Sequence, residues 1–371
     1  MTDDIHAHTR GAQAAPGESG AGDTGPVPAY SFVDRPDVPP RQRLMLLANG
    51  QRFSAVVYAL AELNVADQLV KGPRTVAELA DAVGADEAAL YRMLRCAALL
   101  GVFQELDGRQ FALTPLAEGL RTDLPDGVRD AVLLDGSGFF WGSFGSILHS
   151  ARTGRPGFDA AHGMSFWEYL QGNPEAGEVF DDAMTTISRR LGGLYLDRVD
   201  FSRFPVVADI GGGRGYFLAE ILRRNPGVRG VLFDRAQVAD TANELLSERE
   251  VADRVEVVGG DFFTDPVPSG CDAYVLKTVL HDWPDEKAVE ILRGVRRAIS
   301  DSAARLLVLE QVVAPGNTWD TAKFLDVDML VVMGGRERNL DEWRALLAAG
   351  GFALDCEPAV GDWAVLECRP H

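Results

Sequence analysis

The chain has 371 residues, 46% hydrophobic and 25% charged, a composition typical of a globular protein with more than one compact core. Its formal net charge of −19 repels phosphate backbones, so we do not expect nucleic acid as its main partner. No stretch approaches the ~20 apolar residues of a membrane span, and the polar N-terminus has no apolar signal core, so we expect a cytoplasmic protein without membrane contact. The four cysteines form no CxxC pair and lie beside no histidine cluster, which predicts neither a metal centre nor a disulfide framework.

The composition and the pattern of apolar residues change along the chain and predict four segments. Residues 1–39 are rich in proline and glycine and poor in apolar residues, which is typical of a disordered tail. Residues 40–122 form a small N-terminal domain, residues 123–200 a helical linker with many aromatics, and residues 201–371 a larger α/β domain.

In the small domain, the spacing of apolar residues first predicts an amphipathic helix around Phe53–Leu63. Thr75 followed by Glu78 predicts a capping box at the start of a second helix, which Gly84 ends. Another helix is expected at about 87–100, and a short hairpin follows around Asp107–Gly108. Together these elements predict a winged-helix module.

A winged helix that reads DNA needs a basic recognition helix. The helix expected here carries only two basic residues, Arg92 and Arg95, against the acidic Asp86 and Glu87 at its start. An oligomerisation role is therefore the preferred interpretation. A ligand-sensing DNA-binding regulator remains the weaker alternative.

From Pro205 onward, apolar runs and helical patterns alternate, which predicts a doubly wound α/β domain with a seven-stranded sheet. The strands are expected at 206–210, 229–233, 254–258, 272–277, 304–311, 352–358 and 362–369. The helices are expected near 216–225, 235–249, 284–299 and 339–350. In such a domain, ligands bind beyond the carboxyl ends of the strands.

A glycine-rich turn follows the first of these strands. The segment Asp209–Gly215 reads D-x-G-x-G-x-G, which makes Asp209, Gly211 and Gly213 candidates for ligand binding. The dinucleotide fingerprint G-x-G-x-x-G fails, because Tyr216 or Leu218 stands where its last glycine would be. The spacing instead resembles the cofactor loop of methyltransferases, which holds a nucleoside carrying an amino acid.

Acidic residues end the second and third strands. Asp234 lies 23 positions after Gly211 and can accept hydrogen bonds from both ribose hydroxyls. Asp261 can accept from an adenine amino group, and Phe262 can stack on the adenine ring. The alternatives are an acidic surface residue for Asp234 and a core aromatic for Phe262.

His281 is expected at the carboxyl end of the fourth strand, where a substrate would lie. A hydroxyl with a pKa near ~10 needs a proton acceptor at neutral pH, and histidine is suited to that role. Glu310, at the end of the fifth strand, can orient the imidazole if the two strands are neighbours, and Glu337 is a further acidic candidate. Each carboxylate alone could be a surface charge, but together with His281 they form a coherent acid–base set.

These residues resemble those of a known family, the dimeric small-molecule O-methyltransferases of plant phenylpropanoid and bacterial polyketide or antibiotic pathways. The resemblance covers about residues 40–371 and is carried by the motifs DIGGGRG, GDFF, LKTVLHDW and GGRERNLDEWRALLAAGGF. It implies S-adenosylmethionine as methyl donor, S-adenosylhomocysteine as product, no metal, and a homodimer formed through the N-terminal domain.

The resemblance also implies roles for individual residues. His281 is expected to be the general base, and Glu310 and Glu337 to orient it. The implied cofactor ligands are Gly211, Gly213, Asp234, Asp261, Phe262 and Lys277. Our candidates for the pocket of an aromatic acceptor are Trp141, Phe166, Trp167, Phe180, Met184, Asp282, Met329 and Met333.

Some members of this family lack the histidine and hydroxylate or decarboxylate instead of methylating. Because His281 is present, we expect O-methylation of a small aromatic or polyketide-like metabolite in secondary metabolism. C-methylation, hydroxylation and decarboxylation on the same fold remain alternatives, and the sequence does not identify the acceptor.

Overall fold

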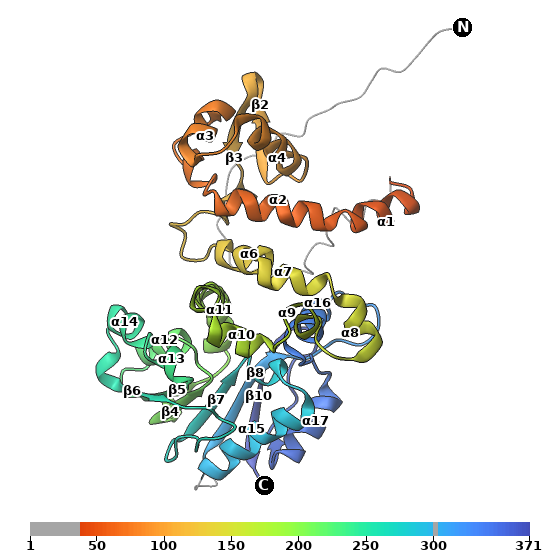
Figure 1. Cartoon of the computed structure of the whole chain (residues 1–371). Coiled ribbons are helices and arrows are strands. Elements are labelled where there is room, and N and C mark those ends of the chain that lie inside the picture. Colours follow the sequence, from red (N-terminus) through yellow and green to blue (C-terminus); the bar gives the residue numbers. More distant parts are fainter. Residues whose placement is uncertain (1–37, 300–302) are drawn as a thin grey trace, which may run out of the picture. The chain divides into compact units, whose positions relative to one another are not determined.

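The computed structural model describes residues 38–299 and 303–371 of the chain (Figure 1). The chain divides into two units, residues 1–48 and residues 49–371. Helix α1 (Pro40–Ala48) is the described part of the first unit, and it exposes the apolar side chains of Leu44, Met45 and Leu47. The tail predicted for residues 1–39 lies outside the described residues except for its last two positions.

The second unit begins with a helical module that carries a three-stranded sheet. Its elements are α2 (Gly50–Glu62), η1 (Asp67–Leu69), β1 (Arg74–Thr75), α3 (Val76–Val83), α4 (Glu87–Leu99), β2 (Phe103–Leu106), η2 (Asp107–Arg109), β3 (Gln110–Leu113) and α5 (Pro115–Glu118). The strands pair antiparallel in the order β1-β3-β2. The capping box is confirmed, because Thr75 Oγ1 accepts from the amide of Glu78 and the Glu78 carboxylate accepts from the amide of Thr75. The predicted helices and the hairpin are therefore confirmed.

A run of helices follows, as the sequence predicts for this segment. They are α6 (Arg129–Gly136), α7 (Gly138–Phe144), α8 (Ile147–Thr153), α9 (Gly157–His162), α10 (Phe166–Gly172) and α11 (Pro174–Leu196). Apolar side chains of all these helices except α8 form a common core with the segment 331–333. Among the described helices of the chain, none is both long and apolar enough to span a membrane.

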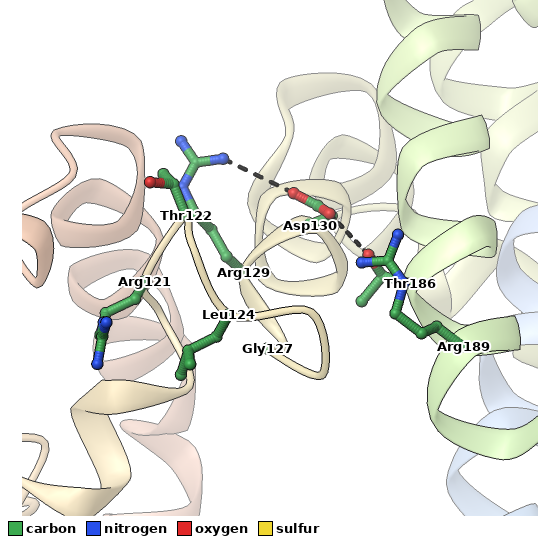
Figure 2. A pocket seen from close by; sticks show the side chains of 8 residues that line it. All are labelled: Arg121, Thr122, Leu124, Gly127, Arg129, Asp130, Thr186 and Arg189. Carbon is green, nitrogen blue, oxygen red and sulfur yellow. Dashed lines mark hydrogen bonds and ion pairs between the residues drawn. The ribbon is translucent and has the colours of Figure 1, made fainter. Parts of the chain in front are cut away.

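A small cavity of about 100 Å³ lies where α6 and α11 meet, and Figure 2 shows the side chains that line it. Thr186 on α11 donates a hydrogen bond to Asp130 on α6 over 2.7 Å. Arg189 donates to the carbonyl of Pro125, and Arg129 to the side chain of Asn64 at the end of α2. These bonds connect α6 with its neighbours, and no candidate site residue lines the cavity.

The C-terminal part is built on a seven-stranded sheet in the order β6-β5-β4-β7-β8-β10-β9. The strands are β4 (Val206–Ile210), β5 (Arg229–Asp234), β6 (Val255–Gly259), β7 (Ala273–Lys277), β8 (Arg305–Gln311), β9 (Phe352–Leu354) and β10 (Trp363–Pro370). The first five are parallel, whereas β10 runs antiparallel to both β8 and β9. The carboxyl ends of the five parallel strands therefore share one edge of the sheet.

Helices cover both faces of this sheet (Figure 1). The remaining elements are η3 (Phe201–Arg203), α12 (Tyr216–Arg224), α13 (Ala236–Ala239), α14 (Ala242–Glu248), η4 (Ala252–Arg254), η5 (Leu280–Asp282), α15 (Asp285–Ala298), α16 (Ala322–Asp328), the π-helix η6 (Met329–Met333) and α17 (Leu340–Ala349). Residues of β7 alternate between two cores, because Tyr274 and Leu276 pack with α15 and α17 while Ala273 and Val275 pack with α12 and α14. The doubly wound fold is thereby confirmed.

Two predicted elements differ from the structure. The helix expected over 235–249 is interrupted, since α13 ends before α14 begins. At the interruption Thr241 Oγ1 donates a hydrogen bond to the carbonyl of Val238, which competes with the helical hydrogen bonds of the main chain. The strand expected over 352–358 stops at Leu354, a few residues before Pro358, which has no N–H to offer a neighbouring strand. The sequence analysis did not foresee α16 and η6, which lie between β8 and α17.

Candidate active site

The glycine-rich turn between β4 and α12 brings bare backbone to the edge of the sheet. Gly211 has φ 71°, and a Cβ there would lie 2.8 Å from the Val279 side chain, so a larger residue would clash. Gly213 has φ 59°, and no atom lies within 4 Å of the place a Cβ would take. A ligand can therefore approach the main chain closely at Gly213, next to the N-terminus of α12.

Asp234 lies beside this turn at the end of β5. Its two carboxylate oxygens accept hydrogen bonds from the amides of Gly213, over 2.8 Å, and Arg235, over 2.7 Å. Burial raises the pKa of Asp234, and these two hydrogen bonds oppose the rise. Each oxygen keeps a further lone pair, so the carboxylate can still accept from the hydroxyls of a ligand.

Asp209 and Lys277 lie beneath the turn on the neighbouring strands β4 and β7. The Asp209 carboxylate is buried, and neither of its oxygens has a hydrogen-bond partner among the described residues. Burial raises its pKa to about 7, against the opposing charge of Lys277. Burial also lowers the pKa of Lys277, whose Nζ donates to Thr278 Oγ1 over 3.2 Å. A buried carboxylate without a hydrogen-bond partner is unfavourable. A ligand that donates a hydrogen bond to Asp209 would therefore bind favourably at this place.

Asp261 and Phe262 follow β6. Asp261 Oδ1 accepts from the amide of Phe263 over 2.9 Å, which shapes the local turn. The Phe262 ring is partly buried and meets the Trp283 ring edge-on, with centroids 5.9 Å apart. Trp283 was missed by the sequence analysis although it directly follows His281 and Asp282, and its ring also stacks on Trp167 at 5.7 Å.

His281 lies in η5, the turn that follows β7, and its side chain is 7% exposed. Nδ1 of the ring lies 2.7 Å from Glu337 Oε1 and 3.4 Å from Glu310 Oε2. Nε2 lies 3.4 Å from Asp282 Oδ1. The structure thus brings the three candidate catalytic residues together, with both glutamates beside Nδ1. When Nδ1–H donates to Glu337, Nε2 is the free nitrogen of the neutral ring.

Glu310 also binds the main chain of the same turn. It lies on β8, next to β7, and its Oε1 accepts from the amides of Val279, Leu280 and His281 over 3.1, 3.0 and 3.3 Å. Sequence analysis assigned Glu310 only to the imidazole. The structure adds that its carboxylate fixes the backbone on which the imidazole is carried.

The charges around His281 determine its protonation. Burial by itself would lower the pKa of the imidazole, but the carboxylates of Glu310, Glu337 and Asp282 outweigh burial and raise that pKa to about 10. Burial in turn raises the pKa of Glu310 above its ordinary value. A raised pKa means that the ring holds a proton more firmly once it has accepted one. The capacity of His281 to accept a proton therefore increases as the pH rises toward 10.

The pocket candidates occupy different environments. Phe166, Phe180 and Met329 are buried, and both phenylalanines belong to the core of the helical region. Trp167, Met184 and Met333 are partly buried at the edge of that core, while Trp141 on α7 is half-buried outside it. Asp282 lies against His281. The partly buried residues at this edge are the better candidates for an acceptor pocket.

Asp328 at the end of α16 gives a prediction about stability. Burial, with a contribution from Asp135, raises the pKa of its carboxyl to about 7, and no partner within the described part of the chain compensates. The unfolded chain loses this proton near pH ~4. The protonated carboxyl therefore contributes stability that is fully present below that pH. This contribution is lost as the pH rises through 7 and the buried group becomes charged. We expect Asp328→Asn to raise Tm by a few degrees at pH 8, with a smaller gain at pH 5.

Thermal unfolding followed by circular dichroism at both pH values measures this effect. The matched control is Asp253→Asn, which changes an exposed aspartate in η4. An equal Tm for Asp328→Asn and the unaltered protein at pH 8 would contradict the assignment of an uncompensated charge.

Two adjacent segments of the chain match known protein families. Residues 45–123 match the O-methyltransferase dimerisation domain. Residues 144–353 match the O-methyltransferase domain, which contains the glycine-rich turn, His281 and both glutamates. The two matches divide the chain between the helical module and the part that carries the candidate active site.

Individual proteins match over nearly the whole chain. Phenazine O-methyltransferase PhzM of Lysobacter antibioticus is 39% identical over 334 residues, covering 90% of this chain and 97% of the relative. The 8-amino-8-demethylriboflavin N,N-dimethyltransferase of Streptomyces davaonensis is 40% identical over 342 residues, covering 91% and 97%. The crystal structure of NcsB1, an O-methyltransferase from neocarzinostatin biosynthesis in complex with S-adenosylmethionine and 2-hydroxy-5-methyl naphthoic acid, matches with a TM-score of 0.75 at 33% identity, covering 86% and 96%.

Proposed function

The chain belongs to the O-methyltransferase family, and from this premise we propose that it transfers the methyl group of S-adenosylmethionine to a hydroxyl of a small aromatic metabolite in secondary metabolism. The observation that carries the proposal is the 2.7 Å contact between His281 Nδ1 and Glu337 Oε1 at the carboxyl edge of the sheet. We further propose that the protein is a homodimer assembled through its dimerisation domain.

The residues at the glycine-rich turn fit the methyl donor. Within the part of the chain that the structure describes, no atom lies close to the Cβ position of Gly213, and the buried Asp209 carboxylate has no hydrogen-bond partner. Asp234 has lone pairs available for ribose hydroxyls. Asp261, Phe262 and Lys277 complete the proposed set for the adenine and the amino-acid part. When bound, the donor supplies a methyl group already activated on a sulfonium.

In the proposed mechanism, His281 removes the proton from the acceptor hydroxyl at Nε2. Glu337 accepts a hydrogen bond from Nδ1–H, which fixes the ring tautomer and stabilises the imidazolium that forms. Glu310 holds the amides of the turn, so the ring keeps its position while the proton moves. Partly buried apolar side chains such as Met184 and Trp167 limit the access of water to the reacting atoms.

Asp234→Ala is expected to weaken binding of S-adenosylmethionine by about tenfold or more, because a charged hydrogen-bond acceptor contributes about 1.5–3 kcal/mol. Isothermal titration calorimetry measures the dissociation constant directly. Asp253→Ala, at an exposed position, is the control and should bind normally. Unchanged affinity in Asp234→Ala would remove this residue from the ribose site.

The function is tested by incubating the protein with S-adenosylmethionine and a panel of acceptors, followed by mass spectrometry of the products. Suitable acceptors, chosen after the names and bound ligands of relatives, are a hydroxylated phenazine, 1,4-dihydroxy-2-naphthoic acid and 3-amino-4-hydroxybenzoic acid. We expect a product heavier by CH2, because the methyl group replaces the hydroxyl proton, together with S-adenosylhomocysteine. Gain of an oxygen atom or loss of carbon dioxide would instead indicate hydroxylation or decarboxylation.

The third acceptor carries both an amine and a hydroxyl, so fragmentation of its product distinguishes O-methylation from N-methylation. N-methylation is a second candidate because the riboflavin-type relative is an N,N-dimethyltransferase.

A metal-assisted reaction is also testable, since ligand atoms of His281, Glu310 and Glu337 all lie within 4.8 Å of one another. We expect full activity after treatment with a chelator, and loss that divalent cations restore would contradict the proton-transfer role.

A further inference from the structure

Arg338 is the one buried arginine among the described residues, and its side chain has no exposed surface. All five of its N–H donors have acceptors. Nε donates to Asp285 Oδ1 over 2.9 Å; Nη1 donates to the carbonyls of Leu280 and Arg336 over 3.0 and 3.3 Å; Nη2 donates to the carbonyl of Trp283 and to Asp285 Oδ1 over 2.9 and 2.8 Å. A guanidinium so fully bonded holds its neighbours in one geometry.

Two of these acceptors lie on either side of the proposed base. The Leu280 carbonyl precedes His281 and the Trp283 carbonyl follows Asp282, so Arg338 joins the two ends of the turn. The amide of Arg336 donates to the carbonyl of His281 itself over 2.8 Å, and a Cβ on Gly335 would overlap that carbonyl oxygen. The segment 335–338 therefore contacts the main chain of the turn at several consecutive residues.

The same segment also links the two glutamates of the site. Glu337 is the residue directly before Arg338, and the amide of Val313 donates to the carbonyl of Arg338 over 3.0 Å. Val313 continues the chain from β8, which carries Glu310. The positive charge of Arg338 also favours the ionised form of Glu310 and lowers its pKa against the effect of burial.

We propose that Arg338 is a positioning residue that fixes the turn 280–283, so that the imidazole of His281 keeps its orientation against Glu337. This rests on the proposed function, in which His281 is the base. Asp285, whose side chain is 52% exposed, neutralises and orients the guanidinium from the outer side. Lysine cannot replace arginine here, because its three donors lack the planar arrangement that reaches both carbonyls and the carboxylate.

The first test uses NMR of protein with ¹⁵N-labelled histidine and needs no acceptor. The chain has six histidines, and the Nδ1–H signal of His281 is identified by its loss in His281→Gln. We expect a slowly exchanging, hydrogen-bonded Nδ1–H signal in the unaltered protein and its loss by exchange with water in Arg338→Lys. Arg344→Lys is the matched control, because Arg344 makes its ion pairs on the surface of α17 and should leave the signal intact.

The second test measures kcat and KM with the acceptor that the panel identifies. A displaced catalytic group can cost up to about 10²-fold in rate, so we expect kcat of Arg338→Lys to fall about tenfold or more. The dissociation constant of S-adenosylmethionine should change less than about twofold. A loss that reflected misfolding would impair both quantities together.

An unchanged Nδ1–H signal and a kcat within about twofold of the unaltered protein, in a folded Arg338→Lys variant, would overturn the proposal. If Arg338→Lys does not fold, Asp285→Asn decides: a weakened signal and a severalfold lower kcat support the proposal, and unchanged values contradict it. Different results contradict the two proposals, His281 as the base and Arg338 as a positioning residue. Full turnover in His281→Gln contradicts the base, whereas loss of turnover in His281→Gln with full activity in Arg338→Lys contradicts only the positioning role.

Discussion

Replacing His281 by glutamine is expected to lower kcat by about 10²–10⁴-fold, the range that general base catalysis contributes. Glutamine can retain a hydrogen bond to Glu337 but has no basic nitrogen, so it cannot accept a proton from the acceptor hydroxyl at any pH of the assay. Because the ring lies beyond the strand end and is not among the residues assigned to the nucleoside, S-adenosylmethionine should bind His281→Gln with near-normal affinity. Single-turnover assays with radiolabelled methyl donor, alongside calorimetry, separate the two quantities.

His162→Gln is the matched control for this change. His162 on α9 is half-buried, and its Nε2 lies 2.9 Å from the carbonyl of Phe139, far in sequence from any strand end of the sheet. We expect this variant to keep most of its activity. Turnover of His281→Gln equal to that of the unaltered protein, at the pH where the unaltered protein is most active, would mean that another group, or the acceptor's own ionisation, supplies the base.

Glu337→Gln is expected to produce a second large loss, also of about 10²–10⁴ in kcat, because it removes the control of the ring tautomer. The carboxylate accepts from Nδ1–H and leaves Nε2 free, whereas a glutamine amide can donate to Nδ1 and place the ring proton on Nε2. A ring protonated at Nε2 cannot take up the proton of an acceptor that faces that nitrogen. Glutamine has nearly the size and shape of glutamate, so the fold should persist.

The pH dependence gives this variant its own signature. Glu337 contributes to raising the pKa of His281 to about 10, so its removal lowers that pKa. Since a base acts in its deprotonated form, activity of the unaltered protein should rise with pH toward 10, and that of Glu337→Gln should reach its lower plateau at a lower pH. Profiles of kcat against pH measure both. Glu290→Gln on the surface of α15 is the control, and an unshifted profile in Glu337→Gln would contradict the electrostatic role.

Much of the fold followed from local patterns. The strands from β4 to β8 lie within one or two residues of their predicted positions, because each is a short apolar run bounded by turn residues. The interruption at Thr241 and the short β9 were mispredicted, since hydropathy records neither a side-chain hydrogen bond nor the N–H that a nearby proline lacks. The helix α16 and the π-helix η6 were missed as well.

The site was predictable in part for the same reason. Placement of the glycine-rich turn, Asp234 and His281 at strand ends needs only the order of elements along the chain, since parallel strands present their carboxyl ends at one edge. The side chains at these strand ends then suggested their roles, a hydrogen-bond acceptor for Asp234 and a proton acceptor for His281. Sequence analysis could not distinguish Phe166 and Phe180, which are buried in the core, from Trp167 and Met184 at its edge, because burial depends on packing between distant helices.

The sequence by itself thus determined the α/β class, the cofactor loop and the candidate base, all of which are encoded within a few consecutive residues. Only the tertiary structure decided that β8 pairs with β7, that Glu337 reaches across 56 positions to the ring of His281, and that Arg338 is buried against the carbonyls of the same turn. The physical reason is chain folding at long range. Contacts between residues far apart in sequence depend on strand order and packing, and a local sequence pattern predicts neither of them.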